Sequence, residues 1–244
     1  MYFYLYDDSL AEPKQAAIVA DLETHLTDLG LSGRIGRLGP LKSPTELVKT
    51  ALKAGAKTIV AVGNDRTVSQ AINAVATMGA GNNVALGILP IGHPVVIAGL
   101  LGIPEGEGAV AVLAARNIVT VDLGRVNNYY FLTSVRVEAQ NGVTLMCDGR
   151  FSLQPIEPVN TFMLKNLDRS ISCQDGYLEA RLEVGGSRWW KKTRQSVIPI
   201  QRGELTATGP ATVVAEESYT ANLPVTVEVV PQALRIIVGR DRAF

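Results

Sequence analysis

Apolar residues between Tyr2 and Asn117 follow two different spacings. Short uninterrupted apolar runs, typical of strands buried on both faces of a sheet, occur at Tyr2–Tyr6, Thr58–Val62 and Val84–Pro90, and a further strand is expected at Ser32–Leu38. Apolar residues at helical spacing separate these runs and predict helices at Pro13–Leu29, from Ser43-Pro44 onward, at Thr67–Met78 and at Ala109–Ala115. Strands and helices that alternate in this way predict a doubly wound, parallel α/β domain.

From Ile118 onward the spacing changes to the two-residue period of strands. Short segments rich in β-branched residues occur at Ile118–Leu123, Tyr129–Val137, Val143–Met146, Arg150–Leu153, Thr161–Leu164, Leu178–Val184, Val197–Ile200, Ala211–Ala215, Val225–Val230 and Leu234–Val238. Hairpin-type pairs such as Asn127-Asn128, Asp148-Gly149 and Asp175-Gly176 separate them. We therefore expect two domains, an α/β domain at 1–117 and an antiparallel β-sandwich at 118–244, with a last strand that could return to the first domain.

Composition narrows the class of protein. The 23 Lys and Arg residues are balanced by 23 Asp and Glu residues, so the chain has no net charge that would attract nucleic acid or an anionic membrane. A hydrophobic content of 47% with 19% charged residues describes a folded globular protein. Cys147 and Cys173 are expected to be reduced core residues and are too few for a zinc site. With no leader and no bilayer-spanning apolar run, we expect a cytoplasmic protein.

Two polar turns follow buried strands of the predicted parallel sheet, at Val62–Thr67 and Leu89–Pro94. Ligands of open parallel sheets bind beyond these carboxyl ends. In the first turn, the amides that open a helix favour an anion, and the guanidinium of Arg66 could bind a phosphate. The alternative is that Asp65 only caps the helix predicted to begin at Thr67, since Asp is common near helix starts.

A basic and aromatic cluster stands out in the second half of the chain: Arg188-Trp-Trp-Lys-Lys-Thr-Arg194. Aromatic and basic side chains favour membrane interfaces, so the cluster could contact a lipid headgroup or a partner. The simpler interpretation, which we prefer, is an exposed hairpin whose tryptophans pack on the sandwich.

Five segments in a fixed order carry a resemblance to a known family: Leu86–Gly92, Leu101–Pro104, Val121–Asn127, Asp175–Glu179 and Leu223–Pro231. Together they resemble the diacylglycerol kinase catalytic-domain family, which is related to bacterial lipid kinases and NAD kinases. The resemblance runs from about Thr45 to Val238 and implies an α/β domain, a β-sandwich and a nucleotide bound in the cleft between them. It also implies ATP and Mg²⁺ as cofactors, a lipid substrate with a reactive hydroxyl, and a possible homodimer.

The first family motif, Gly-Gly-Asp-Gly-Thr, places its glycines against the nucleotide phosphates and uses its Asp for Mg²⁺ or the acceptor hydroxyl. This chain has Gly63-Asn64-Asp65-Arg66-Thr67 in its place. The resemblance implies Asp65 as catalytic residue and metal ligand, and Gly63, Asn64, Arg66 and Thr67 as nucleotide-binding residues. If the turn required a left-handed backbone, Asn64 would tolerate it, whereas Arg66 would cost ~1–2 kcal/mol.

The second family motif, Gly-Thr-Gly-Asn-Asp-Phe-Ala, is represented by Gly92-His-Pro-Val-Val-Ile-Ala98. The resemblance implies Gly92 and His93 as nucleotide-binding residues. Val95 and Val96 replace residues that form hydrogen bonds, and losing two charge-assisted contacts would cost roughly 3–6 kcal/mol of binding. We therefore expect this segment to be mainly a helix start packed into the cleft.

The third family motif, Asp-Gly-Glu, falls at Glu216-Glu217-Ser218 when it is counted back from Pro224. Ser218 replaces the last carboxylate, so Glu216 or Glu217 could form the C-terminal acid site only if the register shifts. The turn after the first strand also departs from the family, because Asp7–Leu10 stands where Asn and Gly are usual.

Three functions remain open from the sequence. The first is ATP-dependent phosphoryl transfer to a lipid-type hydroxyl, which depends on positioning and on charge neutralisation by Mg²⁺. The second is a relative without catalysis that binds a nucleotide or another small phosphorylated ligand through Arg66, Thr67 and His93, as a sensor or scaffold. The third is a purely structural partner protein.

Overall fold

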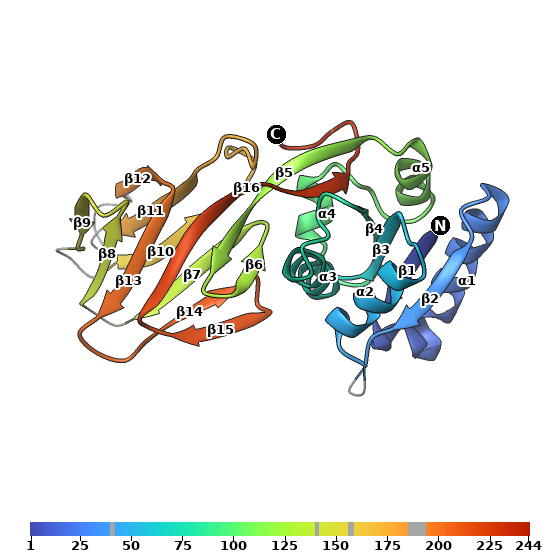
Figure 1. Cartoon of the computed structure of the whole chain (residues 1–244), viewed down its shortest axis with the longest axis horizontal. Helices are drawn as coiled ribbons and strands as arrows, with labels where there is room; N and C mark the ends of the chain where they lie inside the picture. The colour runs from blue at the N-terminus through green and yellow to red at the C-terminus, as the bar shows by residue number, and fades with distance from the viewer. Residues whose placement is uncertain (40–41, 140–141, 156–158, 185–193) are drawn as a thin grey trace, which may run out of the picture. The chain divides into compact units, whose positions relative to one another are not determined.

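The computed structural model describes residues 1–39, 42–139, 142–155, 159–184 and 194–244 (Figure 1). They form an N-terminal unit, Met1–Val121 with Gln232–Ala243, and a C-terminal unit, Asp122–Pro231 with Phe244. The division falls within two strands, β5 (Ile118–Val126) and β16 (Val225–Ile237). Most of the basic and aromatic cluster, 188–193, lies outside the described residues.

The N-terminal unit is built on a parallel sheet. Its strands run in the order β2, β1, β3, β4 and β16, with bounds β1 Tyr2–Tyr6, β2 Gly33–Arg37, β3 Thr58–Gly63 and β4 Ala85–Pro90. All residues of β3 and β4 are buried, as expected for central strands covered on both faces. The parallel α/β prediction is therefore confirmed.

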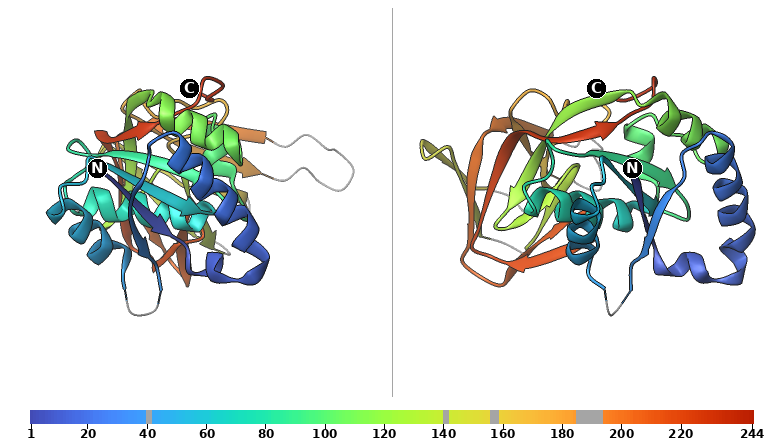
Figure 2. Two further views of the ribbon diagram at one scale, coloured as in Figure 1. Left: turned by 90° about the vertical axis from the view of Figure 1, so that its right-hand side faces the viewer. Right: turned by 45° about the vertical axis from the view of Figure 1, so that its right-hand side comes forward.

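Helices cover both faces of this sheet. Their bounds are η1 Asp8–Ala11, α1 Pro13–Asp28, α2 Pro44–Lys53, α3 Asp65–Thr77, α4 Val96–Leu100 and α5 Glu107–Ala115. α1 packs against α5, and α2 packs against α3 (Figure 2). α2 begins where the sequence indicated, since Ser43 and Glu46 form a reciprocal capping box around Pro44. Among the described residues, no helix has the length and hydropathy that crossing a bilayer requires.

The C-terminal unit consists of antiparallel strands. Their bounds are β6 Tyr129–Phe131, β7 Ser134–Ala139, β8 Val143–Cys147, β9 Phe151–Leu153, β10 Val159–Lys165, β11 Leu178–Val184, β12 Arg194–Ile200, β13 Arg202–Ala207, β14 Ala211–Ala215 and β15 Tyr219–Asn222. One sheet has the order β12, β11, β10, β7, β14 and β15, and β16, β13, β8 and β9 form another run of neighbours. Inward residues of both runs make one core, which includes Phe162, Leu205 and Val213. Cys147 and Cys173 are buried and free, as expected.

Three predicted strands differ in the structure: one is split into two strands, and two are joined into one. The segment Tyr129–Val137 forms β6 and β7, because the amides of Leu132 and Thr133 donate to the Glu216 carboxylate, at 2.8 and 2.6 Å, as the chain passes from β6 to β7. Conversely, the two segments predicted between Val225 and Val238 form the single strand β16, in which Gln232 takes a left-handed conformation with φ of 50°. Hydrophobic periodicity predicts neither the break between β6 and β7 nor the continuation of β16 through Gln232, since both depend on single residues.

Asn166 joins three segments of the C-terminal unit. Its fully buried side-chain amide donates to the carbonyl oxygens of Asp122 and Leu132, at 3.0 and 2.8 Å. The Asp122 carboxylate accepts the Gly176 amide at 2.8 Å, and the Asp122 amide donates to the Cys173 carbonyl at 2.6 Å. Buried polar groups require such partners. The segments around Asp122 and Gly176 that carried the family resemblance therefore have a structural role.

Replacing Asn166 by Ala removes both side-chain donors and leaves two carbonyl oxygens short of a partner. We expect the free energy of unfolding, measured by urea denaturation, to fall by about 2–4 kcal/mol. Asn82→Ala, at an exposed position, is the matched control and should stay within about 0.5 kcal/mol of the unsubstituted protein. Equal losses for the two variants would contradict this role of Asn166.

Candidate functional site

The turn that follows β3 requires glycine at position 63. Gly63 has φ of 154°, and a Cβ built on it would lie 2.6 Å from Thr67 Oγ1 and 3.0 Å from Asp7 Cβ. Both contacts are shorter than van der Waals packing permits. Gly63 therefore lets the start of α3 approach the end of β1, and the turn keeps the first glycine of the family motif for this reason.

Asn64, not Asp65, caps α3. The Asn64 side-chain oxygen accepts the amides of Arg66 and Thr67, at 3.1 and 3.4 Å, and the helix begins at Asp65. The expected helix is present and begins two residues earlier than Thr67, and the alternative that Asp65 only caps it is wrong, because Asn64 is its cap. Arg66 lies within the helix and Asn64 has φ of −88°, so neither residue bears the left-handed strain considered above.

The Asp65 carboxylate binds the second turn. Its two oxygens accept the amides of Val96 and Ile97, at 2.8 and 2.9 Å, which are the first amides of α4. The Asp65 amide donates in return to the Pro94 carbonyl at 2.8 Å. The Asn64 side-chain amide also donates to the His93 carbonyl, at 3.4 Å. These bonds join Gly63–Thr67 and Gly92–Ile97 into one surface feature, here called the strand-end site.

Exposed basic side chains occur on both turns of the strand-end site. Arg66 and His93 are exposed, while Thr67 is fully buried. Gly92 has φ of 81°, a conformation that favours glycine. The expected helix start is present, since α4 begins at Val96, and its residues Ile97 and Ala98 are buried, whereas Val96 itself is 60% exposed. The site thus exposes the side chains of Arg66 and His93, whereas its Asp65 carboxylate accepts two backbone amides.

Asp7 is a member of this cluster that the sequence analysis did not select. Its carboxylate accepts the Thr67 hydroxyl, and also the amide and hydroxyl of Ser9 at 2.9 and 2.6 Å. Burial alone would raise the pKa of Asp7, but these hydrogen bonds outweigh burial and hold the pKa below its ordinary value. The sequence contains one signal for Asp7: it directly follows β1, which pairs in parallel with β3.

Glu216 and Glu217, the predicted acid site, lie in the β14–β15 turn of the C-terminal unit. Both have left-handed backbones, with φ of 49° and 52°, and the Ser218 amide closes the turn on the Ala215 carbonyl at 2.9 Å. The Glu216 carboxylate accepts the Leu132 amide, the Thr133 amide and the Thr133 hydroxyl. Glu217 forms an ion pair with Arg136 at 3.2 Å. The turn thus uses both carboxylates in contacts within its own unit.

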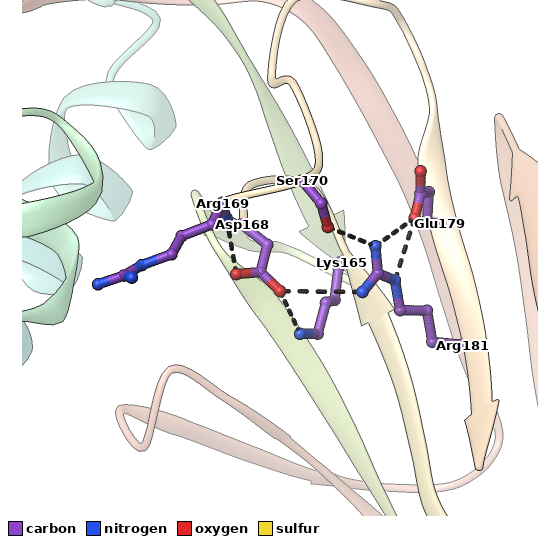
Figure 3. A network of polar contacts seen from close by, with 6 residues as sticks. All are labelled: Lys165, Asp168, Arg169, Ser170, Glu179 and Arg181. Atoms are coloured by element: carbon purple, nitrogen blue, oxygen red, sulfur yellow. Dashed lines mark hydrogen bonds and ion pairs between the residues drawn. The ribbon is translucent and has the colours of Figure 1, made fainter. Parts of the chain in front are cut away.

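Another charged network of the C-terminal unit surrounds Asp168 (Figure 3). The Asp168 carboxylate forms an ion pair with the Lys165 ammonium at 2.6 Å and lies 4.0 Å from the Arg181 guanidinium. Arg181 also forms an ion pair with Glu179 and donates a hydrogen bond to the Ser170 hydroxyl. Burial would raise the pKa of Asp168, but Lys165 and the Arg169 amide lower it further than burial raises it. The Arg169 side chain points away from the network in Figure 3. These contacts brace the turn that follows Asn166.

The residues of the strand-end site fit poorly to the ATP–Mg²⁺ pair that the family resemblance implies. Both Asp65 oxygens accept backbone amides, and the amides that open α3 are capped by Asn64. Within the described part of the chain, no group of three or more His, Cys, Asp or Glu side chains is placed to hold a metal ion. Each Asp65 oxygen already accepts one amide of α4, so a metal ion bound by Asp65 would share the carboxylate with these two bonds.

Comparison with known proteins assigns the chain to a family. A model of the diacylglycerol kinase catalytic domain matches residues 5–126, which is half of the 244-residue chain. The chain therefore belongs to the diacylglycerol kinase catalytic domain family. The matched region contains Asp7 and both turns of the strand-end site.

Similar proteins agree with this assignment. "Probable lipid kinase YegS-like" of Citrobacter koseri is 37% identical over 82 residues, and "Probable lipid kinase YegS" of Shigella flexneri is 35% identical over 81 residues. Each match covers 33% of this chain and 27% of the relative, so the chain matches about a quarter of the length of these relatives. A crystal structure described as a diacylglycerol kinase from Bacillus anthracis str. Sterne shares the fold, with a TM-score of 0.81 over 98% of this chain and 97% of that one, at 14% identity.

Adding a methyl group at Gly63 should disrupt the start of α3. We expect Gly63→Ala to lower the free energy of unfolding by about 2–4 kcal/mol, through backbone strain and the clash with Thr67. Gly99→Ala is the matched control, because Gly99 lies in α4 with no atom within 4 Å of its Cβ position. The control should be neutral or stabilising by ~0.5–1 kcal/mol. Urea denaturation measures both, and a neutral Gly63→Ala would refute the packing argument.

The Asp7 carboxylate should contribute to stability in a pH-dependent way. Because its pKa is lower in the folded than in the unfolded chain, the ionised form stabilises the fold above the unfolded value of about 4. This contribution is lost as the pH falls through the folded pKa. The difference in unfolding free energy between the unsubstituted protein and Asp7→Asn should therefore be largest near neutral pH and shrink below about pH 4. Asp28→Asn, at an exposed position, controls for the loss of one charge, and a pH-independent difference for Asp7→Asn would contradict the expectation.

Proposed function

We propose that this chain is a member of the lipid kinase family that binds a nucleotide or a related phosphorylated ligand at the strand-end site without transferring a phosphoryl group. One observation carries the proposal. The carboxylate that the family motif provides for chemistry, Asp65, accepts two backbone amides, while Arg66 and His93 remain exposed on the adjoining turns.

Cationic side chains replace the backbone contacts expected from the family motifs. The amides at the start of α3 are satisfied by Asn64, so they do not offer free donors to a phosphate. Arg66 can donate two parallel hydrogen bonds to phosphate oxygens, and a protonated His93 can add another. The bonds between the two turns keep these residues on the same edge of the sheet. This arrangement supports phosphate recognition by side chains.

Binding is tested by thermal denaturation of the full chain with ATP, ADP and NAD, each with and without Mg²⁺. A ligand at a hundred times its dissociation constant adds about 2.7 kcal/mol of stability, which corresponds to a rise in Tm of about 5–10 °C for a chain of this size. Arg66→Ala should weaken the affinity at least about tenfold, since it removes a charge-assisted contact. Arg34→Ala, an exposed arginine on β2, is the matched control and should leave the affinity unchanged.

Phosphoryl transfer is the second candidate function, supported by the lipid kinase names of the relatives. It is tested by incubating the chain with labelled ATP, Mg²⁺ and either diacylglycerol or NAD. We expect no labelled product above that formed by a heat-denatured sample. Transfer that is abolished by Asp65→Ala would overturn the proposed absence of catalysis, and no rise in Tm with any nucleotide would overturn the proposed binding.

A further inference from the structure

Helix α4 starts without a cap of its own. It contains only the five residues Val96–Leu100, and its N-cap residue Val95 makes no side-chain hydrogen bond. The first amides of a helix have no partner within the helix, and a valine side chain has no acceptor to offer. A helix of this length is not stable by itself, so it needs support from the rest of the unit.

Asp65 provides this support from a different helix. Its carboxylate accepts the amides of Val96 and Ile97 at 2.8 and 2.9 Å, across 31 and 32 residues of chain. It is available for this role because Asn64 already caps α3. Charge-assisted bonds to an N-terminal turn are among the stronger hydrogen bonds in proteins.

Contacts in the other direction complete the link between the turns. The Asp65 amide donates to the Pro94 carbonyl, and the Ile91 amide donates to the Gly63 carbonyl at 3.0 Å. His93 lies between these attachment points, and its own carbonyl accepts the Asn64 side chain. The backbone of the segment that bears His93 is therefore held on both sides.

We infer that Asp65 is a positioning residue: it caps α4 in trans and thereby holds the His93 segment against the start of α3, where Arg66 projects. This role differs from that of a metal ligand or an acid–base group, for which the carboxylate would face the ligand. The effect on α4 is independent of the proposed function, whereas the effect on ligand affinity depends on it.

The inference makes a specific prediction about second-site rescue. Asp65→Ala should increase the hydrogen-exchange rates of the Val96 and Ile97 amides at least about tenfold, because they lose their acceptor. Val95→Asp places a carboxylate at the N-cap position of α4 itself. The double variant Asp65→Ala/Val95→Asp should therefore recover most of the protection of both amides. Exchange in Asp65→Ala that equals the unsubstituted rate would overturn the inference.

ATP affinity provides the second measurement, with ATP as the probe in the full chain. Asp65→Ala should weaken binding about tenfold although Arg66 and His93 are retained, and the double variant should restore it. If the double variant recovers amide protection but not affinity, Asp65 contacts the ligand directly and the positioning role is overturned. If the unsubstituted chain does not bind ATP, the proposed function fails, while the exchange measurement still decides the role of Asp65.

Two further variants keep the test decisive if Asp65→Ala does not fold. Asp65→Asn keeps one side-chain oxygen, so it should retain protection of one of the two amides even if Asp65→Ala does not fold. Asp28→Ala removes an exposed carboxylate from α1 and should change neither exchange at α4 nor affinity. Full protection of both amides in Asp65→Asn would also contradict the inference.

Discussion

Backbone amides at the carboxyl ends of β3 and β4 need acceptors, and the strand-end site depends on how this need is met. Two helices start there, α3 at Asp65 and α4 at Val96, and the first amides of a helix have no partner within the helix. Asn64 supplies the acceptor for α3 and Asp65 supplies it for α4. Each such bond contributes only about 0.5–3 kcal/mol at these exposed and part-buried positions, but together they link the two turns.

In the C-terminal unit, the Glu216 carboxylate likewise accepts backbone amides of a turn. Glu216 holds a left-handed backbone, which costs about 1–2 kcal/mol for a residue with a Cβ. Its carboxylate accepts three donors at the start of β7, and these bonds offset the strain. Asn166 continues the same network to Asp122 and Gly176. Polar residues in segments that carry the family resemblance thus form hydrogen bonds that maintain the architecture here.

These contacts connect the family assignment to the proposed function. The chain belongs to the diacylglycerol kinase catalytic domain family and has its fold, yet the acidic side chains at two of its motif positions are bonded within their own units. Catalysis of phosphoryl transfer requires charge that is positioned toward the reacting phosphate. The proposed function rests on this difference, since Arg66 and His93 are exposed at the strand-end site while Asp65 accepts two amides.

Local patterns in the sequence were enough to predict the fold class and the two kinds of unit, and they pointed to the two turns of the strand-end site as candidates. These features follow from local patterns: short apolar runs rich in β-branched residues and followed by Gly63 or Gly92 indicate buried strands that end in turns. Only the tertiary structure decided the roles of the polar side chains. Asp65 and Asp7 act on residues that are 32 and 60 positions away, and Glu216 acts across 84. A carboxylate has the same chemistry whether it caps a helix, accepts a hydroxyl or binds a metal, so its role depends on which donors the fold brings within 3 Å of it.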